Sequence, residues 1–472
     1  MSEHIEPTAS SMTLIPPNGL LLPLHAVVDP DNRRLFQAPF SFAGNGIYTV
    51  VWQVISVDDG HFTRGSYQFT VGTSSMLLMS ASSVHYHASL KEAVTIWFKL
   101  IGQYDLLALC AFLFLFGKLS GISSPLRARV VSYAQRYFVA ITTLLIVGVV
   151  SYVWLETGTL AEVQGLSMKT AFYEYLRTNG GVLSLILFVV ALVLFPLGMS
   201  LVKNLAEGKL LLRTIIPAAC LFLIGAYTQA RLSHAAASDF LPEFSVLVNM
   251  IHLMGKGLWV GSILVLFFVF LPAFIHEDAS EQLLKRLYTC LGKLIAAALI
   301  LGAPSGIWIV WLHLKSPTNL FTTDWGKVLL ILLGFASLLF VLRMCSFFIF
   351  ERMKRCNLCV RSFTVLEVLA ALAVSFFSAL MIITTPPLPA DGSHVVRQFG
   401  IFEAALVLCA FGFIMFGIFL FRIVEKRERM IDLLPLEEVA PPIGKLSLAY
   451  GISVLVVLLF GAIALFVTHF FF

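Results

Sequence analysis

Histidine and methionine side chains with metal-binding potential gather in two parts of the chain. They are Met76, Met79, His85 and His87, ahead of the first long apolar run, and His234 and His252 near the middle. A thioether sulfur suits Cu(I), and an imidazole binds copper in either oxidation state. An ordinary linker is the competing interpretation of the first group, and a packed histidine is that of His252. The residue types therefore predict a metal-binding protein, and copper is the metal that suits both kinds of ligand.

The apolar run 244–274 contains two ionisable residues that can act together. His252 and Lys256 are spaced i, i+4 and so share one face of a helix. Ionisable residues at membrane depth are costly and usually face a bundle interior or a water-filled cavity. Asp105 lies at a similar depth in the run 93–117, which predicts an ion pair between Asp105 and Lys256. The glycines of the same run, Gly255, Gly257 and Gly261, predict close approach of neighbouring helices.

Two further features carry weaker chemical signals. Cys356 and Cys359 form a single Cys-x-x-Cys pair, a spacing that binds Zn or Cu(I), does redox work, or occurs incidentally. Glu367, in the run 362–384, is another candidate for a buried charge. The chain contains no Gly-rich phosphate loop, no His-Glu-x-x-His and no Gly-x-Ser-x-Gly. We therefore do not expect an enzyme.

The elements that position these residues are long apolar helices. The chain of 472 residues is 58% hydrophobic and 12% charged, whereas a soluble domain is about a quarter charged. Ten runs are each long enough to cross a bilayer as a helix: 93–117, 135–155, 181–203, 210–229, 244–274, 288–312, 325–349, 362–384, 400–422 and 446–471. The sequence therefore predicts a mainly α, polytopic transmembrane bundle whose partner is the lipid bilayer.

The orientation of this bundle follows from basic residues in the connecting loops. Lys and Arg follow the odd-numbered runs: Lys118, Arg127, Arg129 and Arg136; Lys203, Lys209 and Arg213; Lys285, Arg286 and Lys293; Arg343, Arg352, Lys354, Arg355 and Arg361; and Arg422, Lys426, Arg427 and Arg429. Cytoplasmic loops carry this excess, so both chain ends are expected outside. Most histidines, including His313, then fall toward the outside. The net charge of +5 reflects orientation, and no nucleic-acid partner is expected.

Residues 1–74 differ from the rest of the chain. Short apolar stretches alternate with turn residues, and residues 48–54 and 66–71 show strand-like alternation with aromatic and β-branched side chains. This pattern predicts a small Ig-like antiparallel β-sandwich outside the membrane. We therefore divide the chain into a β domain at 1–74, a linker at 75–92 and a transmembrane domain at 93–472.

The β region resembles the C-terminal three-quarters of the periplasmic copper-binding CopC domain. The matching stretches are Ser2 to Pro7, Gly46 to Trp52, Asp59-Gly60-His61 and Gly65 to Val71. The resemblance implies a Cu(II) site with Asp59 and His61 as ligands, together with a histidine at the mature N-terminus that is missing here. Residues 1–6 have neither the basic nor the apolar region of a signal peptide. We expect the start codon to lie further upstream.

The remainder resembles the copper resistance protein D (CopD) family. The resemblance rests on Ser233-His234-Ala235, His252 with Trp259-Val260-Gly261, Ser305-Gly306, Thr322-Thr323 before Trp325-Gly326, Glu367, and Thr384-Thr385-Pro386. Family members usually have a lysine in the seventh run where this chain has Leu332. A CopC-like part followed by a CopD-like part implies a fusion that handles copper at the bacterial inner membrane.

The sequence predicts uptake of copper ion across that membrane, contributing to copper homeostasis or resistance. Copper is captured by Asp59 and His61, relayed by Met76, Met79, His85 and His87, and taken into the bundle by His234 and His252. A periplasmic copper-binding protein is the expected protein partner. Two alternatives remain open: a membrane haem or electron-transfer protein ligated by His234 and His252, and a non-transporting assembly factor that passes copper to a periplasmic partner.

Overall fold

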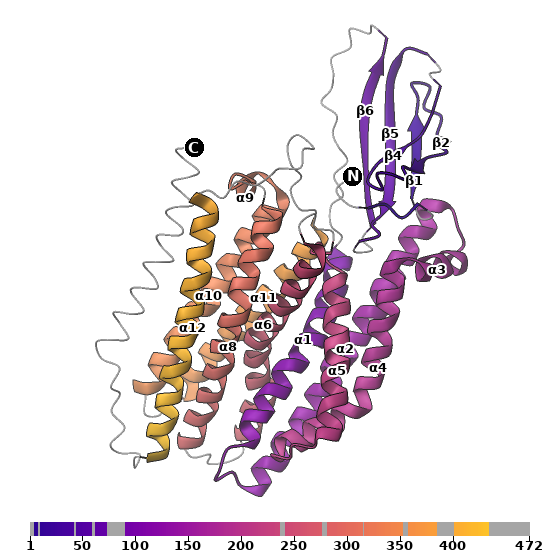
Figure 1. Cartoon of the computed structure of the whole chain (residues 1–472). Coiled ribbons are helices and arrows are strands. Elements are labelled where there is room, and N and C mark those ends of the chain that lie inside the picture. Colours follow the sequence, from indigo (N-terminus) through magenta and orange to yellow (C-terminus); the bar gives the residue numbers. More distant parts are fainter. Residues whose placement is uncertain are drawn as a thin grey trace.

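The structure is a computed structural model with strands at the N-terminus and helices in the rest of the chain (Figure 1). It describes residues 4–7, 10–41, 44–58, 62–72, 90–236, 241–275, 281–314, 316–352, 357–384 and 401–433.

The N-terminal part contains two antiparallel sheets. The strands are β1 (Ser11–Ile15), β2 (Leu22–Leu24), β3 (Val27–Val28), β4 (Phe36–Gln37), β5 (Gly46–Ile55) and β6 (Phe62–Val71). One sheet has the order β2-β1-β5-β6, and β3 and β4 form the other. Strands β5 and β6 pair from Gly46 opposite Val71 to Ile55 opposite Phe62. They include the two predicted strands, so the prediction of antiparallel strands is confirmed.

Aromatic side chains hold the long hairpin of β5 and β6 together. Tyr48 is fully buried, and its ring stacks on Phe69 with centroids 5.5 Å apart. Trp52 covers Gly65 on the neighbouring strand, where an added Cβ would lie 2.4 Å from Trp52 Cζ2. Only glycine fits under this ring, and such cross-strand pairs stabilise a sheet.

Long helices make up most of the remaining chain. They are α1 (Leu90–Gly117), α2 (Ser124–Gln164), α3 (Met168–Arg177), α4 (Asn179–Ala206), α5 (Leu212–Arg231), α6 (Pro242–Val265), the π-helix η2 (Leu266–Phe270), α7 (Leu271–Ile275), α8 (Glu281–His313), α9 (Asn319–Thr322), α10 (Asp324–Arg352), α11 (Asn357–Ile383) and α12 (Ile401–Leu433). Nine helical segments in the described residues are long and apolar enough to cross a membrane. They coincide with the first nine predicted runs, and the tenth, 446–471, lies outside the described residues.

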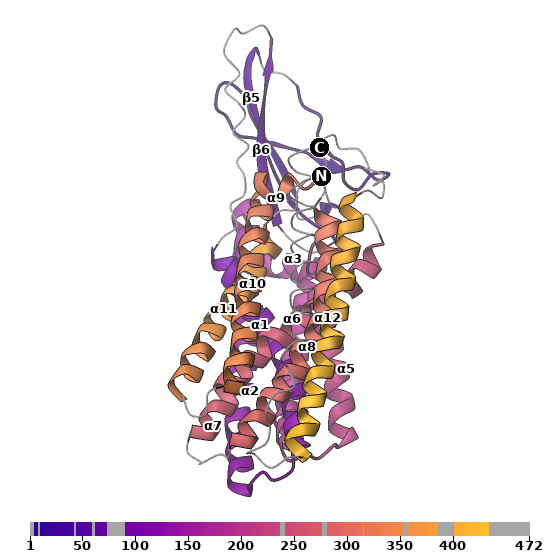
Figure 2. The same cartoon turned by 90° about the vertical axis from the view of Figure 1, so that its left-hand side faces the viewer.

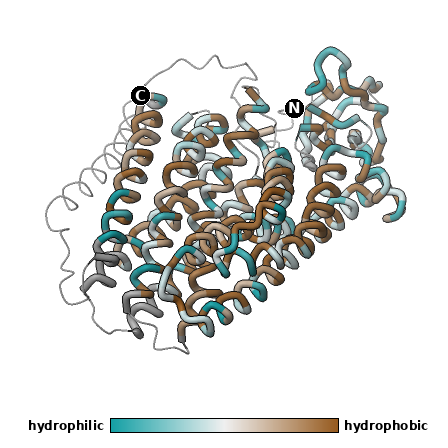
Figure 3. The backbone as a smooth tube through the Cα atoms, turned by 60° about the horizontal axis from the view of Figure 1, so that its bottom comes forward, coloured by the Kyte–Doolittle hydropathy of each residue, from teal (hydrophilic) through white to brown (hydrophobic). Residues whose placement is uncertain are grey.

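The outer surface of the bundle is apolar, as lipid contact requires (Figure 3). On α4, four large side chains at helical spacing are 44–49% exposed: Val182, Leu185, Val189 and Leu192. In water such a face would be unfavourable, whereas hydrocarbon covers it without cost. The mainly α, polytopic transmembrane fold predicted from composition is therefore confirmed.

Helix α6 lies between α1 and α8 and approaches both through glycines (Figure 2). A Cβ added to Gly255 would lie 2.5 Å from Gly302 Cα on α8. A Cβ added to Gly257 would lie 2.6 Å from Tyr104 Cβ on α1. Both distances are too short for any side chain, so the predicted close helix approach occurs and uses two faces of α6.

The β region rests on the helices at one end of the bundle (Figure 1). Ile55, at the end of β5, packs in one buried cluster with Leu160 of α2 and Tyr175 of α3. Asn179 Nδ2, at the start of α4, donates a hydrogen bond of 2.9 Å to the backbone oxygen of Val57. Helix α3, which periodicity did not predict, provides part of this contact. The end of β5 is thereby fixed beside the helix ends.

Candidate metal sites

His252 on α6 is held in one orientation by α8. Its Nδ1 lies 2.9 Å from the carbonyl oxygen of Gly302. A carbonyl can only accept a hydrogen bond, so Nδ1 carries the proton and Nε2 carries the lone pair. The ring packs against Gly306, where an added Cβ would lie 2.8 Å from His252 Cε1. Nε2 has no hydrogen-bond partner in the described part of the chain. This is the arrangement typical of a metal-binding histidine, whose other ring nitrogen donates to a carbonyl or carboxylate.

The surroundings of His252 are polar on the α8 side. Ser305 Oγ donates to the same Gly302 carbonyl oxygen at 3.1 Å and to the Leu301 carbonyl oxygen at 2.5 Å. Lys256, one turn further along α6, is half-buried and has no acidic partner among the described residues. The site therefore combines one oriented imidazole, one ammonium group and one hydroxyl.

The predicted ion pair between Asp105 and Lys256 is not formed. Asp105 Oδ2 instead accepts a hydrogen bond of 2.9 Å from Tyr137 Oη on α2, and its carboxylate lies against Gly261. The physical reason is the helix face. Gly261 belongs to the side of α6 that meets α1, whereas Lys256 shares with His252 the side that meets α8. Equal depth in the membrane does not bring two side chains together when they lie on different faces.

His234 lies in the connection between α5 and α6, beside His313 at the end of α8. The two ring centroids are 6.3 Å apart, and the His313 ring lies 5.9 Å from Trp325. His234 is placed near the start of α6 because its neighbour Ser233 accepts a hydrogen bond of 2.7 Å from Asn249 Nδ2. The sequence placed His313 toward the outside but did not identify it as a neighbour of His234.

The predicted ligands do not form a complete metal site in the part of the chain that is described. No group of three or more His, Cys, Asp or Glu side chains there could hold a metal ion. No hydrogen bond joins His234 to His252 within these ranges. Asp59, His61, Met76, Met79, His85 and His87 lie outside the described residues, as do Cys356 and the side chain of Cys359.

The β region does bring one unpredicted pair together beside the Asp-Gly-His motif. His4 Nδ1 lies 2.9 Å from Asp58 Oδ1 and 3.0 Å from Asp58 Oδ2. The backbone N–H of His4 also donates to Asp58 Oδ2 at 2.9 Å. Sequence reasoning missed His4 because nothing in its local pattern indicates pairing with a residue so far along the chain.

Glu367 is a buried charge, as predicted, and it has a partner. It is 1% exposed, and Ser346 Oγ donates to its Oε1 at 2.7 Å. Arg343 Nη1 lies 3.7 Å from its Oε2, and the guanidinium lies over the Tyr288 ring at 5.2 Å. Arg343, assigned to a cytoplasmic loop from sequence, is 2% exposed within α10. It is therefore an interior residue, and the burial of both charges explains why they pair.

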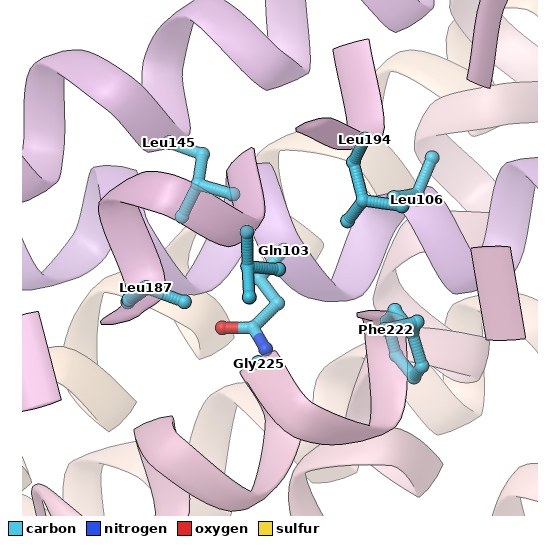
Figure 4. A pocket seen from close by; sticks show the side chains of 8 residues that line it. Gln103, Leu106, Leu145, Leu187, Leu194, Phe222 and Gly225 are labelled. Atoms are coloured by element: carbon cyan, nitrogen blue, oxygen red, sulfur yellow. The ribbon is translucent and has the colours of Figure 1, made fainter. Parts of the chain in front are cut away.

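Helix α1 carries a row of buried polar residues on one face. Glu92, Thr95, Lys99 and Gln103 are 2–8% exposed. Lys99 Nζ lies 3.5 Å from the Tyr152 ring centroid, in a cation–π contact. Gln103 points its amide into a small cavity of about 10 Å³ whose other lining residues are apolar (Figure 4). This cavity is too small and too poor in ligands for a metal centre, so copper chemistry belongs elsewhere.

The fold and these sites define a polytopic, membrane-type helical bundle with an antiparallel β region at one end. Residues 1–72 match the CopC domain family. No curated protein and no solved structure matches the chain. The chain thus combines a CopC domain with an apolar helical region, and the CopC domain implies a copper-related function.

Proposed function

We propose that this protein transports copper into the cell across the bacterial inner membrane, with copper as cargo. The observation that carries the proposal is the position of the CopC domain, whose strand β5 rests on the ends of apolar helices. A copper-binding domain fixed to a membrane bundle can deliver its ion to that bundle without diffusing away.

The proposed route runs from the CopC domain into the bundle. Asp59 and His61 capture copper, and Met76, Met79, His85 and His87 relay it. His234 and His252 then receive it. The proton on His252 Nδ1 supports this role, because it leaves Nε2 as an available lone pair.

The orientation is part of the proposal. The helical region is CopD-like by the motifs around His234 and His252, and the basic loops place the CopC domain on the periplasmic side. A periplasmic copper-binding protein would then be the donor. We propose no catalytic activity.

His252→Gln tests the route. Glutamine retains an N–H for the Gly302 carbonyl but lacks the strong metal-binding lone pair of imidazole. Copper uptake into proteoliposomes should fall by at least about tenfold. Ser305→Ala is the matched control, because it removes a hydrogen bond to the same carbonyl and leaves the imidazole in place. Uptake by His252→Gln equal to that of the control would exclude His252 from the route.

The two alternatives give different results in the same sample. An assembly factor would bind copper and show no uptake by the wild-type protein. A haem protein would show a Soret band after purification. The His252 contacts do not favour haem, because the ring packs directly on Gly306 and no contact joins it to His234 in the described residues.

A further inference from the structure

The start of the described chain is tied to the end of strand β5 at the position of the Asp-Gly-His motif. Val57 N–H donates to the His4 carbonyl oxygen at 2.8 Å, and Ile5 forms a β-bridge with Ser56. These backbone contacts set the His4 side chain beside Asp58. The next residues in the sequence are Asp59, Gly60 and His61.

The Asp58 carboxylate determines which nitrogen of His4 can bind a metal. Both carboxylate oxygens lie within 3.0 Å of Nδ1, and one of them also accepts the His4 backbone N–H. A carboxylate can only accept, so the proton sits on Nδ1 and the lone pair on Nε2. Metal-binding histidines are commonly held by a carboxylate in this way, which fixes the ring and raises its basicity.

Exposure divides the pair into a holder and a ligand. The Asp58 side chain is 17% exposed, whereas that of His4 is 42% exposed. As an ion pair alone, such a contact would contribute little, because exposed pairs are worth about 0–1 kcal/mol. The double acceptance by Asp58 nevertheless fixes both the backbone and the ring of His4. Such fixing suits a ligand whose Nε2 must stay accessible.

We propose that His4 is a copper ligand of the CopC domain, oriented by Asp58 and acting with the Asp-Gly-His motif. This inference rests on the proposed copper capture by Asp59 and His61 and adds a third residue to it. His4 Nε2 would supply an imidazole nitrogen to Cu(II), and Asp58 would act as a positioning residue that does not touch the metal.

The test uses the full-length protein in nanodiscs with one equivalent of Cu(II). His4→Gln retains a side-chain N–H for Asp58 and removes the imidazole. We expect Cu(II) affinity about 10–100-fold weaker and loss of one nitrogen coupling in the electron paramagnetic resonance spectrum. His25→Gln is the matched control, because His25 is exposed elsewhere on the same domain, and it should leave both readouts unchanged.

Asp58→Asn separates positioning from ligation. The amide oxygen still accepts from Nδ1, so all nitrogen couplings should remain while affinity falls. Unchanged affinity and spectrum in His4→Gln would overturn the role of His4. If the wild-type protein binds no Cu(II), the proposed capture by the domain fails instead. Thermal unfolding of the metal-free variants shows whether any loss of binding comes from loss of the fold.

Discussion

Arg343 and Glu367 show how a single buried charge depends on its partner. Both side chains are at most 3% exposed, in the apolar interior between α10 and α11. Removing a charge from water is costly, and the mutual attraction offsets that cost only while both partners are present. The pair therefore constrains the two helices more than its modest contact distance suggests.

Glu367→Gln should destabilise the protein by about 3–5 kcal/mol, because Arg343 is left as an uncompensated buried charge. The double variant Arg343→Met/Glu367→Gln should recover much of this loss. Denaturant unfolding in detergent measures both.

Lys327→Met is the matched control for that experiment. Its partner Asp324 lies on the surface, with side chains 56% and 72% exposed, so the change should be below about 1 kcal/mol. A double variant as unstable as the single variant would show that the charges do not act as a pair.

At the scale of elements, the crossing of α6 with α8 determines the geometry around His252. The hydrogen bond from His252 to the Gly302 carbonyl requires the two backbones to lie close together. Gly255 faces the same Gly302 and allows this approach. The site and the helix contact are thus one structure, and disturbing the crossing should disturb the imidazole.

Gly255→Ala should lower the melting temperature of the purified protein and reduce copper uptake. The added Cβ would lie 2.5 Å from the Gly302 backbone, which can give way only by separating the helices. Gly334→Ala is the control, because nothing lies within 4 Å of a Cβ added there. Equal melting temperatures for the two variants would contradict the observed crossing.

At the scale of the whole molecule, the CopC domain and the bundle meet through one small contact (Figure 2). Ile55 is 2% exposed against α2 and α3, whereas Ile47 on the same strand is 39% exposed. The contact lies next to the Asp-Gly-His motif in the sequence. Docking should therefore affect copper transfer as well as the stability of α3.

Ile55→Asp should release this contact, because a buried carboxylate without a partner is strongly unfavourable. We expect faster amide hydrogen exchange across Met168–Arg177 and slower copper uptake. Ile47→Asp, on an exposed part of the same strand, should change neither. Unchanged exchange in α3 for Ile55→Asp would show that the domain does not depend on this contact.

The sequence alone determined the elements whose cause is local. Apolar runs such as 181–203 predict membrane helices because lipid solvation depends on the composition of each run. The stretches 48–54 and 66–71 predict strands because alternation and turn residues act over a few positions. The resemblance of residues 1–74 to the CopC domain agrees with the family match at 1–72.

Only the tertiary structure decided which side chains meet. Asp105 pairs with Tyr137 rather than Lys256, and His4 contacts Asp58 across the β region. The copper ligands predicted from motifs mostly lie outside the described residues, so they stay predictions. Side-chain partners depend on the faces that neighbouring elements present to each other, and periodicity within one element carries no information about its neighbour's rotation or register.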